Sequence, residues 1–144
     1  MNLTIAMAWA VLTGPLLAML VTPIARAATS AYESDLAAVI NQYRGRHQLP
    51  ALALDPTLTT LAREHSATMA REARLSHEGM PSRVRRSGFG MCVENVGWNY
   101  ASPREQFDGW RASPGHNQNL LDRRVARMGI GVVDGYVTQI ACGT

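Results

Sequence analysis

The sequence predicts an α+β domain in which helices pack against a small, mainly antiparallel sheet. Four segments open with residues typical of helix N-termini, and apolar residues follow them at helical spacing. Two β-rich runs near the end of the chain flank Asp134-Gly135, a dipeptide that favours a two-residue hairpin turn. At 144 residues the chain has the length of one domain.

The first predicted helix opens at Ser30. Ser30 and Glu33 have the spacing of a capping box, in which each side chain accepts a hydrogen bond from the backbone of the other residue. The helix should end near Gln48, because the residue before Pro50 is pushed out of the helical region.

The second predicted helix has Asp55 as its N-cap and Pro56 at its first position. Its apolar stripe fades near Leu75. Residues 76–90 are predicted to be irregular and solvated, because glycines and prolines interrupt them and three arginines lie among them.

The second half of the chain is predicted to alternate between strands and short helices. Residues 91–98 read as a strand. Ser102 and Ser113 each precede a proline and begin a short helix. Residues 128–133 and 136–141 form the closing hairpin.

The charge pattern excludes several functions. The formal net charge is +3, and all fourteen basic residues are arginines. Without lysine there can be no Schiff-base lysine, no Ser-Lys pair and no Walker-type phosphate loop. Arg83, Arg85 and Arg86 cluster, but the arginines are otherwise spread along the chain, whereas nucleic-acid-binding domains concentrate their charge on one face. We therefore expect no nucleic-acid partner.

The first 27 residues are predicted to be a signal peptide, which leaves residues 28–144 as the folded domain. Residues 3–24 are almost wholly apolar, and Ala25-Arg26-Ala27 has the small-x-small pattern that signal peptidase reads. An uncleaved membrane anchor is the alternative. Both interpretations predict export, with the domain extracellular or periplasmic.

Export makes a disulfide between Cys92 and Cys142 the expected state of the two cysteines. A bond that closes a loop of about 50 residues would stabilise a small domain by a few kcal/mol. A reactive thiol paired with a histidine is the alternative.

Three residues are candidates for a functional site. His77 and His116 lie outside the apolar stripes, one entering a loop and the other in the first turn of a helix. Glu94 lies in an otherwise apolar strand, where a carboxylate needs a partner. By contrast, His65 lies on an apolar stripe and is predicted to be a core histidine, and His47 lies at a helix end, where the helix dipole favours a cation.

These residues resemble the CAP superfamily, which includes cysteine-rich secretory proteins, insect venom antigens and plant pathogenesis-related proteins. The resemblance rests on His77, Glu94-Asn95-Val96, the segment 110–116 and the closing segment 129–140, and it covers residues 34–143. The order and spacing of these pieces are most similar to a short bacterial branch of the superfamily.

The resemblance implies a three-layer α-β-α sandwich with a cleft where histidines and acidic residues meet. Members of the superfamily can hold a divalent metal such as Zn²⁺ on two cleft histidines, which here match His77 and His116. Glu94 matches an acidic residue that forms hydrogen bonds within the cleft. Larger members add a second glutamate, and Ser113 stands at that position here.

Three functions follow from the resemblance. The first is a secreted domain that binds a small ligand, a lipid or a cell-envelope component, with Trp98 and Tyr100 as an aromatic wall. The second is a metal-dependent hydrolase in which Glu94 is the general base. The third is a structural or interaction protein with a vestigial cleft. Ser113 in place of a glutamate favours binding over hydrolysis.

Overall fold

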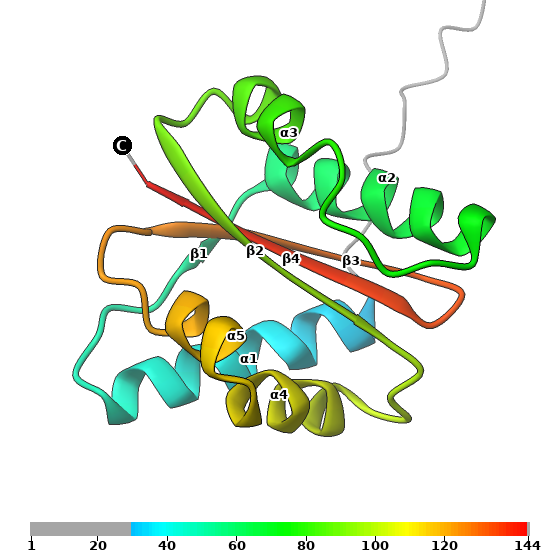
Figure 1. The fold of residues 1–144 in the computed structure, drawn as a ribbon. Helices are drawn as coiled ribbons and strands as arrows, with labels where there is room; N and C mark the ends of the chain where they lie inside the picture. The colour runs from blue at the N-terminus through cyan, green and yellow to red at the C-terminus, as the bar shows by residue number, and fades with distance from the viewer. Residues whose placement is uncertain (1–29, 144) are drawn as a thin grey trace, which may run out of the picture.

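A computed structural model describes residues 30–143, which form helices around one four-stranded sheet (Figure 1). The predicted signal peptide lies outside these residues. The strand order is β1-β3-β4-β2, with β1 parallel to β3 and the other pairs antiparallel. The helices are α1 (Ala31–Arg46), α2 (Pro56–Glu72), α3 (Met80–Ser87), α4 (Pro103–Ala112) and α5 (Pro114–Leu120), and the strands are β1 (Ala53–Leu54), β2 (Met91–Trp98), β3 (Arg127–Val133) and β4 (Tyr136–Gly143).

The sheet lies between two helical layers, as predicted. In Figure 1, α2 and α3 lie above it, and α1, α4 and α5 lie below it. Strand β4 runs through the middle, and all eight of its residues are buried. A strand buried on both faces requires cover on both faces, so the layered α+β architecture is confirmed.

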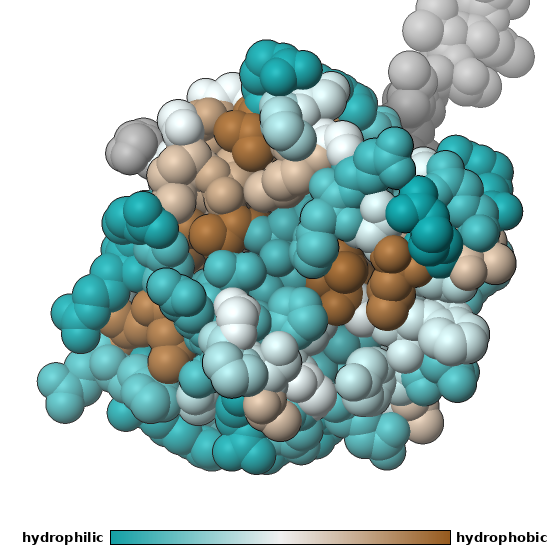
Figure 2. Space-filling model, in the orientation of Figure 1, coloured by the Kyte–Doolittle hydropathy of each residue, from teal (hydrophilic) through white to brown (hydrophobic). Residues whose placement is uncertain are grey.

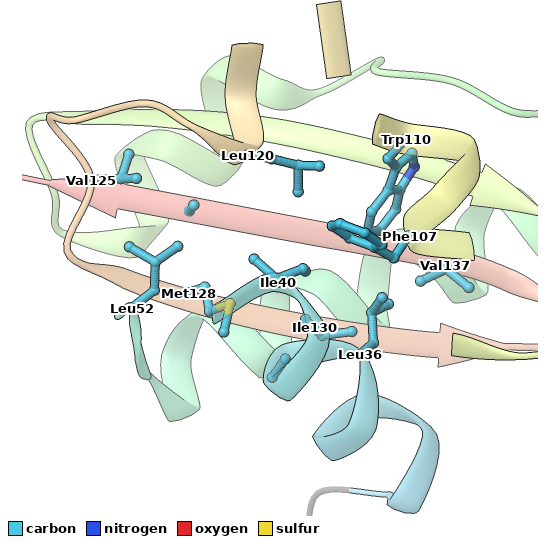
Figure 3. Packing of buried hydrophobic residues seen from close by; sticks show 12 residues of the cluster. Leu36, Ile40, Leu52, Phe107, Trp110, Leu120, Val125, Met128, Ile130 and Val137 are labelled. Atoms are coloured by element: carbon cyan, nitrogen blue, oxygen red, sulfur yellow. The ribbon is translucent and has the colours of Figure 1, made fainter. Parts of the chain in front are cut away.

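Alternation along β4 divides the core in two. Val137 and Ala141 pack with α1, α4 and α5 in the larger apolar cluster, whereas Ile140 and Cys142 pack against α2. Figure 3 shows the larger cluster, in which Trp110 and Phe107 from α4 fill the space between the sheet and α1.

Helix α2 crosses β3 unusually closely, because two glycines remove the side chains between them. A Cβ atom on Gly129 would lie 2.0 Å from the carbonyl carbon of Leu58, and one on Gly131 would lie 2.2 Å from the amide nitrogen of Arg63. Any side chain at either position would push the helix off the sheet.

The predicted hairpin turn and the caps at Ser30, Asp55 and Ser102 are confirmed, whereas Ser113 begins α5 without a side-chain cap hydrogen bond. Ser30 and Glu33 form both hydrogen bonds of a capping box, and the Asp55 carboxylate accepts from the first turn of α2. Asp134 and Gly135 have φ angles of 48° and 78°, the left-handed conformation that a two-residue hairpin turn requires.

The prediction for residues 76–90 was wrong, because α3 forms within them. This helix has no apolar stripe to reveal it, and its two buried residues are Arg83 and Ser87. Arg83 was expected in solvent but is 7% exposed. The two-residue strand β1 was also not predicted, because its pairing with β3 is a tertiary contact.

The predicted disulfide is confirmed. Cys92 on β2 lies directly opposite Cys142 on β4, with their Cα atoms 4.1 Å apart, and the two are bonded.

Side chains from the lower layer cover the outer edge of β2. The Asn119 side-chain amide donates to the Glu94 carbonyl at 3.1 Å, and the Trp110 indole N–H donates to the Val96 carbonyl at 2.8 Å. Two backbone acceptors of this edge strand are thereby satisfied within the chain.

Candidate functional site

Glu94 and Asn95, consecutive residues on β2, point to opposite faces of the sheet. Glu94 lies opposite Ile140 and faces α2 and α3, whereas Asn95 lies opposite Gln139 and faces α5. Both are buried, with exposed fractions of 5% and 0%. This dipeptide therefore connects the two helical layers at the edge of the sheet.

On the upper face, Arg83 and His77 bind the Glu94 carboxylate. The Arg83 guanidinium donates from Nε to Oε2 at 2.7 Å and from Nη2 to Oε1 at 2.8 Å. Nδ1 of His77 lies 3.0 Å from Oε1. A two-bond fork of this kind is the strongest arrangement for a carboxylate and arginine, and it satisfies the requirement of Glu94 for a partner.

The contact with Glu94 determines which nitrogen of His77 carries the proton. A carboxylate only accepts hydrogen bonds, so Nδ1 is the protonated nitrogen of the neutral ring. Nε2 then carries a lone pair. The His77 side chain is 53% exposed, so this lone pair can reach a proton, a metal ion or a ligand.

His65 lies beneath this pair and was not predicted to be part of a site. Its Nε2 is 2.6 Å from the Ser76 carbonyl and 3.8 Å from Oε1 of Glu94, so the N–H donates to Ser76. Burial lowers the pKa of His65, against the opposing effects of the Ser76 carbonyl and the Glu94 charge. A neutral His65 therefore fixes the loop that carries His77.

On the lower face, Asn95 holds the first turn of α5. Its side-chain nitrogen donates to Gln139 Oε1 at 3.0 Å and to the His116 carbonyl at 3.2 Å, and its oxygen accepts from Asn119 at 2.9 Å. Burial lowers the pKa of His116, and the charge of a protonated His77 lowers it further. At neutral pH the His116 ring is therefore uncharged.

A pocket of about 240 Å³ opens beside His116, and Trp98 and Tyr100 line it. Trp98 is 50% exposed and stacks on Tyr136 with ring centroids 5.7 Å apart. Tyr100 is 41% exposed and lies across Gly109, where a Cβ atom would come within 2.4 Å of the Tyr100 hydroxyl. Both rings are held in place while one side of each remains accessible.

The predicted cleft residues form two adjacent groups. His77 and Glu94 are in contact, and His116, Trp98 and Tyr100 share the pocket, which neither His77 nor Glu94 lines. The groups are neighbours, since Leu75 borders the pocket two residues before His77, and the charge of His77 acts on His116. The roles of the five residues remain predictions.

Sequence reasoning missed Arg83, His65 and Asn95 as parts of this arrangement. One signal for Arg83 was available: a carboxylate in an apolar strand needs a cation, and three arginines precede Glu94 by about ten residues. No comparable signal marks His65, because its helical spacing places it in the core, where it lies.

The metal site expected from the resemblance has two imidazole donors. Within residues 30–143, no group of three or more His, Cys, Asp or Glu side chains is arranged to hold a metal ion. A zinc site with a catalytic role usually has three protein ligands and water. His77 and His116 could therefore hold a metal only if water or a ligand supplied the other positions.

Comparison with known proteins identifies the family. The model of the cysteine-rich secretory protein family, CAP, matches residues 37–142. The chain belongs to the CAP family. The CAP domain is 28% identical over 114 residues to the uncharacterized membrane protein YlbC of Bacillus subtilis, a match that covers 74% of this chain and 33% of that protein.

Three solved structures of bacterial proteins share the fold. An extracellular protein containing an SCP domain from Bacillus anthracis matches with a TM-score of 0.75 and 28% identity, over 78% of this chain and 40% of that one. A cysteine-rich secretory protein from Staphylococcus aureus matches with a TM-score of 0.72 and 18% identity, over 78% and 38%. An outer surface protein from Borrelia burgdorferi matches with a TM-score of 0.73 and 18% identity, over 81% and 96%.

The CAP domain thus spans only a third of the B. subtilis relative and about two fifths of the B. anthracis chain. Two of the solved structures are described as extracellular or outer surface proteins. In the part of the chain that the structure describes, no helix is long and apolar enough to cross a membrane.

Proposed function

We propose that this CAP domain is an exported binding module that holds a small ligand, or one end of a cell-envelope component, in the pocket beside His116. The observation that carries the proposal is the pair of half-exposed rings, Trp98 and Tyr100, held in place at the rim of that pocket. Rigid aromatic rings with an accessible face provide contact area at little cost in conformational entropy. The extracellular and outer surface descriptions of related structures support export.

The shape and polarity of the pocket favour a compact ligand over a long acyl chain. Its volume of about 240 Å³ is below the range typical of sites for drug-sized molecules. Ser113 and His116 add polar groups to its lining. On the face shown in Figure 2, apolar residues form separate small patches with hydrophilic residues between them, so this face presents no broad apolar surface.

A divalent metal ion fits the same edge of the sheet as a weakly held partner. His77 would bind it through Nε2, and His116 would contribute a second neutral imidazole. Glu94 would orient the His77 ring from behind, as carboxylates commonly do for histidines that bind metals. When bound, such an ion could anchor an anionic group of the ligand.

The alternative of a hydrolase with Glu94 as general base has little support. The Glu94 side chain is 2% exposed, and both carboxylate oxygens already accept from Arg83. A general base must reach the proton that it removes. In this arrangement the imidazoles of His77 and His116 are the accessible proton acceptors, so a hydrolytic activity would need one of them, and not Glu94, as base.

Tryptophan fluorescence provides the test. Within residues 30–143 the chain has two tryptophans, of which Trp98 is half exposed and Trp110 is buried. We expect a panel of single sugars and short peptides from cell envelopes, each small enough for the pocket, to include a compound that shifts the emission of Trp98. Tyr100→Ala should weaken binding about tenfold, the effect of losing one aromatic contact worth about 1.4 kcal/mol.

Leu54→Ala is the matched control, because Leu54 is 43% exposed on β1, at the opposite edge of the sheet. It should bind as the unmodified protein does. Binding that Tyr100→Ala leaves unchanged would exclude this pocket. The protein could also be used to capture protein partners. If Tyr100→Ala and His77→Ala both capture the same partner as the unmodified protein does, the alternative of an interaction protein gains support.

A further inference from the structure

We infer that Arg83 is the positioning residue of the site: it holds Glu94 and the backbone around His77 together, so that Nε2 is the nitrogen His77 presents to solvent. The inference deepens the proposed function, because it identifies what sets the ligand-facing atom of the same site.

Arg83 makes four hydrogen bonds, two to the Glu94 carboxylate and two to backbone carbonyls of the segment that carries His77. Its Nε and Nη2 donate to the two oxygens of Glu94, at 2.7 and 2.8 Å. Its Nη1 donates to the Glu78 carbonyl at 2.8 Å, and Nη2 also lies 3.4 Å from the His77 carbonyl. One planar guanidinium thus fixes the carboxylate acceptor and the peptide segment that carries the imidazole donor.

The local chain is built to allow this reach. Helix α3 begins after Gly79, whose φ of 77° disfavours any residue with a side chain. A Cβ atom at that position would lie 3.2 Å from Nη1 of Arg83, on the side where the guanidinium meets the Glu78 carbonyl. Arg83 is one of only two residues that α3 buries, so the helix serves mainly to place this side chain.

Lysine could not replace Arg83 in this geometry. An ammonium group is a single point of donation, whereas the guanidinium presents its N–H groups in a rigid planar fork. Only the fork can bond both carboxylate oxygens and still reach the backbone behind them.

The position of Oε1 opposite Nδ1 has a defined consequence for the imidazole. An imidazole in water favours the tautomer with the proton on Nε2, and the Glu94 contact imposes the other one. Without Arg83, Glu94 loses the fork, and the segment at residues 77–78 loses its buried donors. His77 should then return to the Nε2–H tautomer, in which Nε2 can no longer accept a proton or bind a metal.

The test is the tautomer of His77, measured by ¹H–¹⁵N spectra of the histidine rings in ligand-free protein at mildly alkaline pH. Protonated and unprotonated ring nitrogens have well separated ¹⁵N shifts. The unmodified protein should show the protonated signal at Nδ1, and Arg83→Met should move it to Nε2. Arg83→Lys should show a mixture. Arg86→Met is the control, because Arg86 lies on the same helix and pairs with Glu64 at the surface.

Arg83→Gln provides a second route if Arg83→Met does not fold. Its side chain keeps polar groups near Glu94 but is too short and lacks the planar fork that bonds both carboxylate oxygens, so it too should move the proton to Nε2. A His77 that keeps the Nδ1–H tautomer in Arg83→Met or in Arg83→Gln would overturn the inference, as would an Arg83→Lys spectrum identical to that of the unmodified protein. Since no ligand is present, these results do not depend on whether the pocket binds one.

Discussion

Reduction of the Cys92–Cys142 disulfide should remove about 4 kcal/mol from the free energy of unfolding. The bond closes a loop with a sequence separation of 50. The chain-entropy relation gives an entropy loss of about 14 cal/mol/K for a loop of this length, or about 4 kcal/mol at 25 °C. In the folded protein the sheet register already places the two cysteines opposite each other, so the bond acts mainly on the unfolded chain.

Comparison of the oxidised and reduced protein isolates this effect, because the sequence and the packing of Cys142 stay the same. Urea unfolding followed by tryptophan fluorescence gives the free energy and its dependence on urea. The reduced protein should unfold at a much lower urea concentration with a steeper dependence, since its unfolded chain exposes more surface. A loss below about 1 kcal/mol would refute the entropic account.

Three further predictions concern stability. Ala73→Gly should stabilise the protein by about 0.5–1 kcal/mol, because α2 ends at Ala73 with a φ of 48°, a conformation that glycine adopts without strain; an unchanged urea midpoint would contradict this. Gly131→Ala should destabilise the protein by about 3 kcal/mol or more, because its Cβ would meet the backbone of α2. Gly45→Ala is the control: no atom lies within 4 Å of the added Cβ, so the variant should be neutral or stabilising in the same urea assay. Lowering the pH from about 7 to about 5 should reduce the free energy of unfolding. Burial lowers the pKa of His65 and of His116 in the folded protein, whereas a histidine in the unfolded chain has a pKa of about 6.5. Below that pH the unfolded chain therefore binds more protons than the folded protein, which favours unfolding. Each histidine contributes a slope of at most about 1.4 kcal/mol per pH unit, and a slope that stays the same in His65→Gln would show that His65 contributes none of it.

Those parts of the fold that local chemistry controls could be predicted from the sequence. Capping residues such as Ser30 and Asp55 act within one turn of their own helix, and the Asp134-Gly135 turn needs only its own backbone angles. Helix α3 could not be predicted, because a buried ion pair holds it in place and its partner, Glu94, lies on another element. A tertiary contact therefore stabilises α3, and the spacing of apolar residues in the sequence gives no sign of it.

The candidate site shows the same division. His77 and Glu94 were found because each is chemically out of place in its own segment, and they lie in contact. The resemblance linked them to His116, but it did not indicate that Trp98 and Tyr100 share a pocket with His116 rather than with Glu94. Strand alternation alone predicts the wrong grouping, because Glu94 and Trp98 lie four residues apart and therefore on the same face of β2. The pocket instead brings Trp98 together with Gly109 of α4 and His116 of α5, and the sequence does not reveal this tertiary arrangement.

The covered edge of β2 affects how copies of the domain behave when crowded. A bare strand edge invites a strand from another molecule, and such pairing along β2 would bury the surface beside Glu94. Here the carbonyls of Glu94 and Val96 already accept from Asn119 and Trp110, so an incoming strand would have to displace both donors. Pairing of two copies through β2 is therefore disfavoured, which keeps the pocket at this edge accessible.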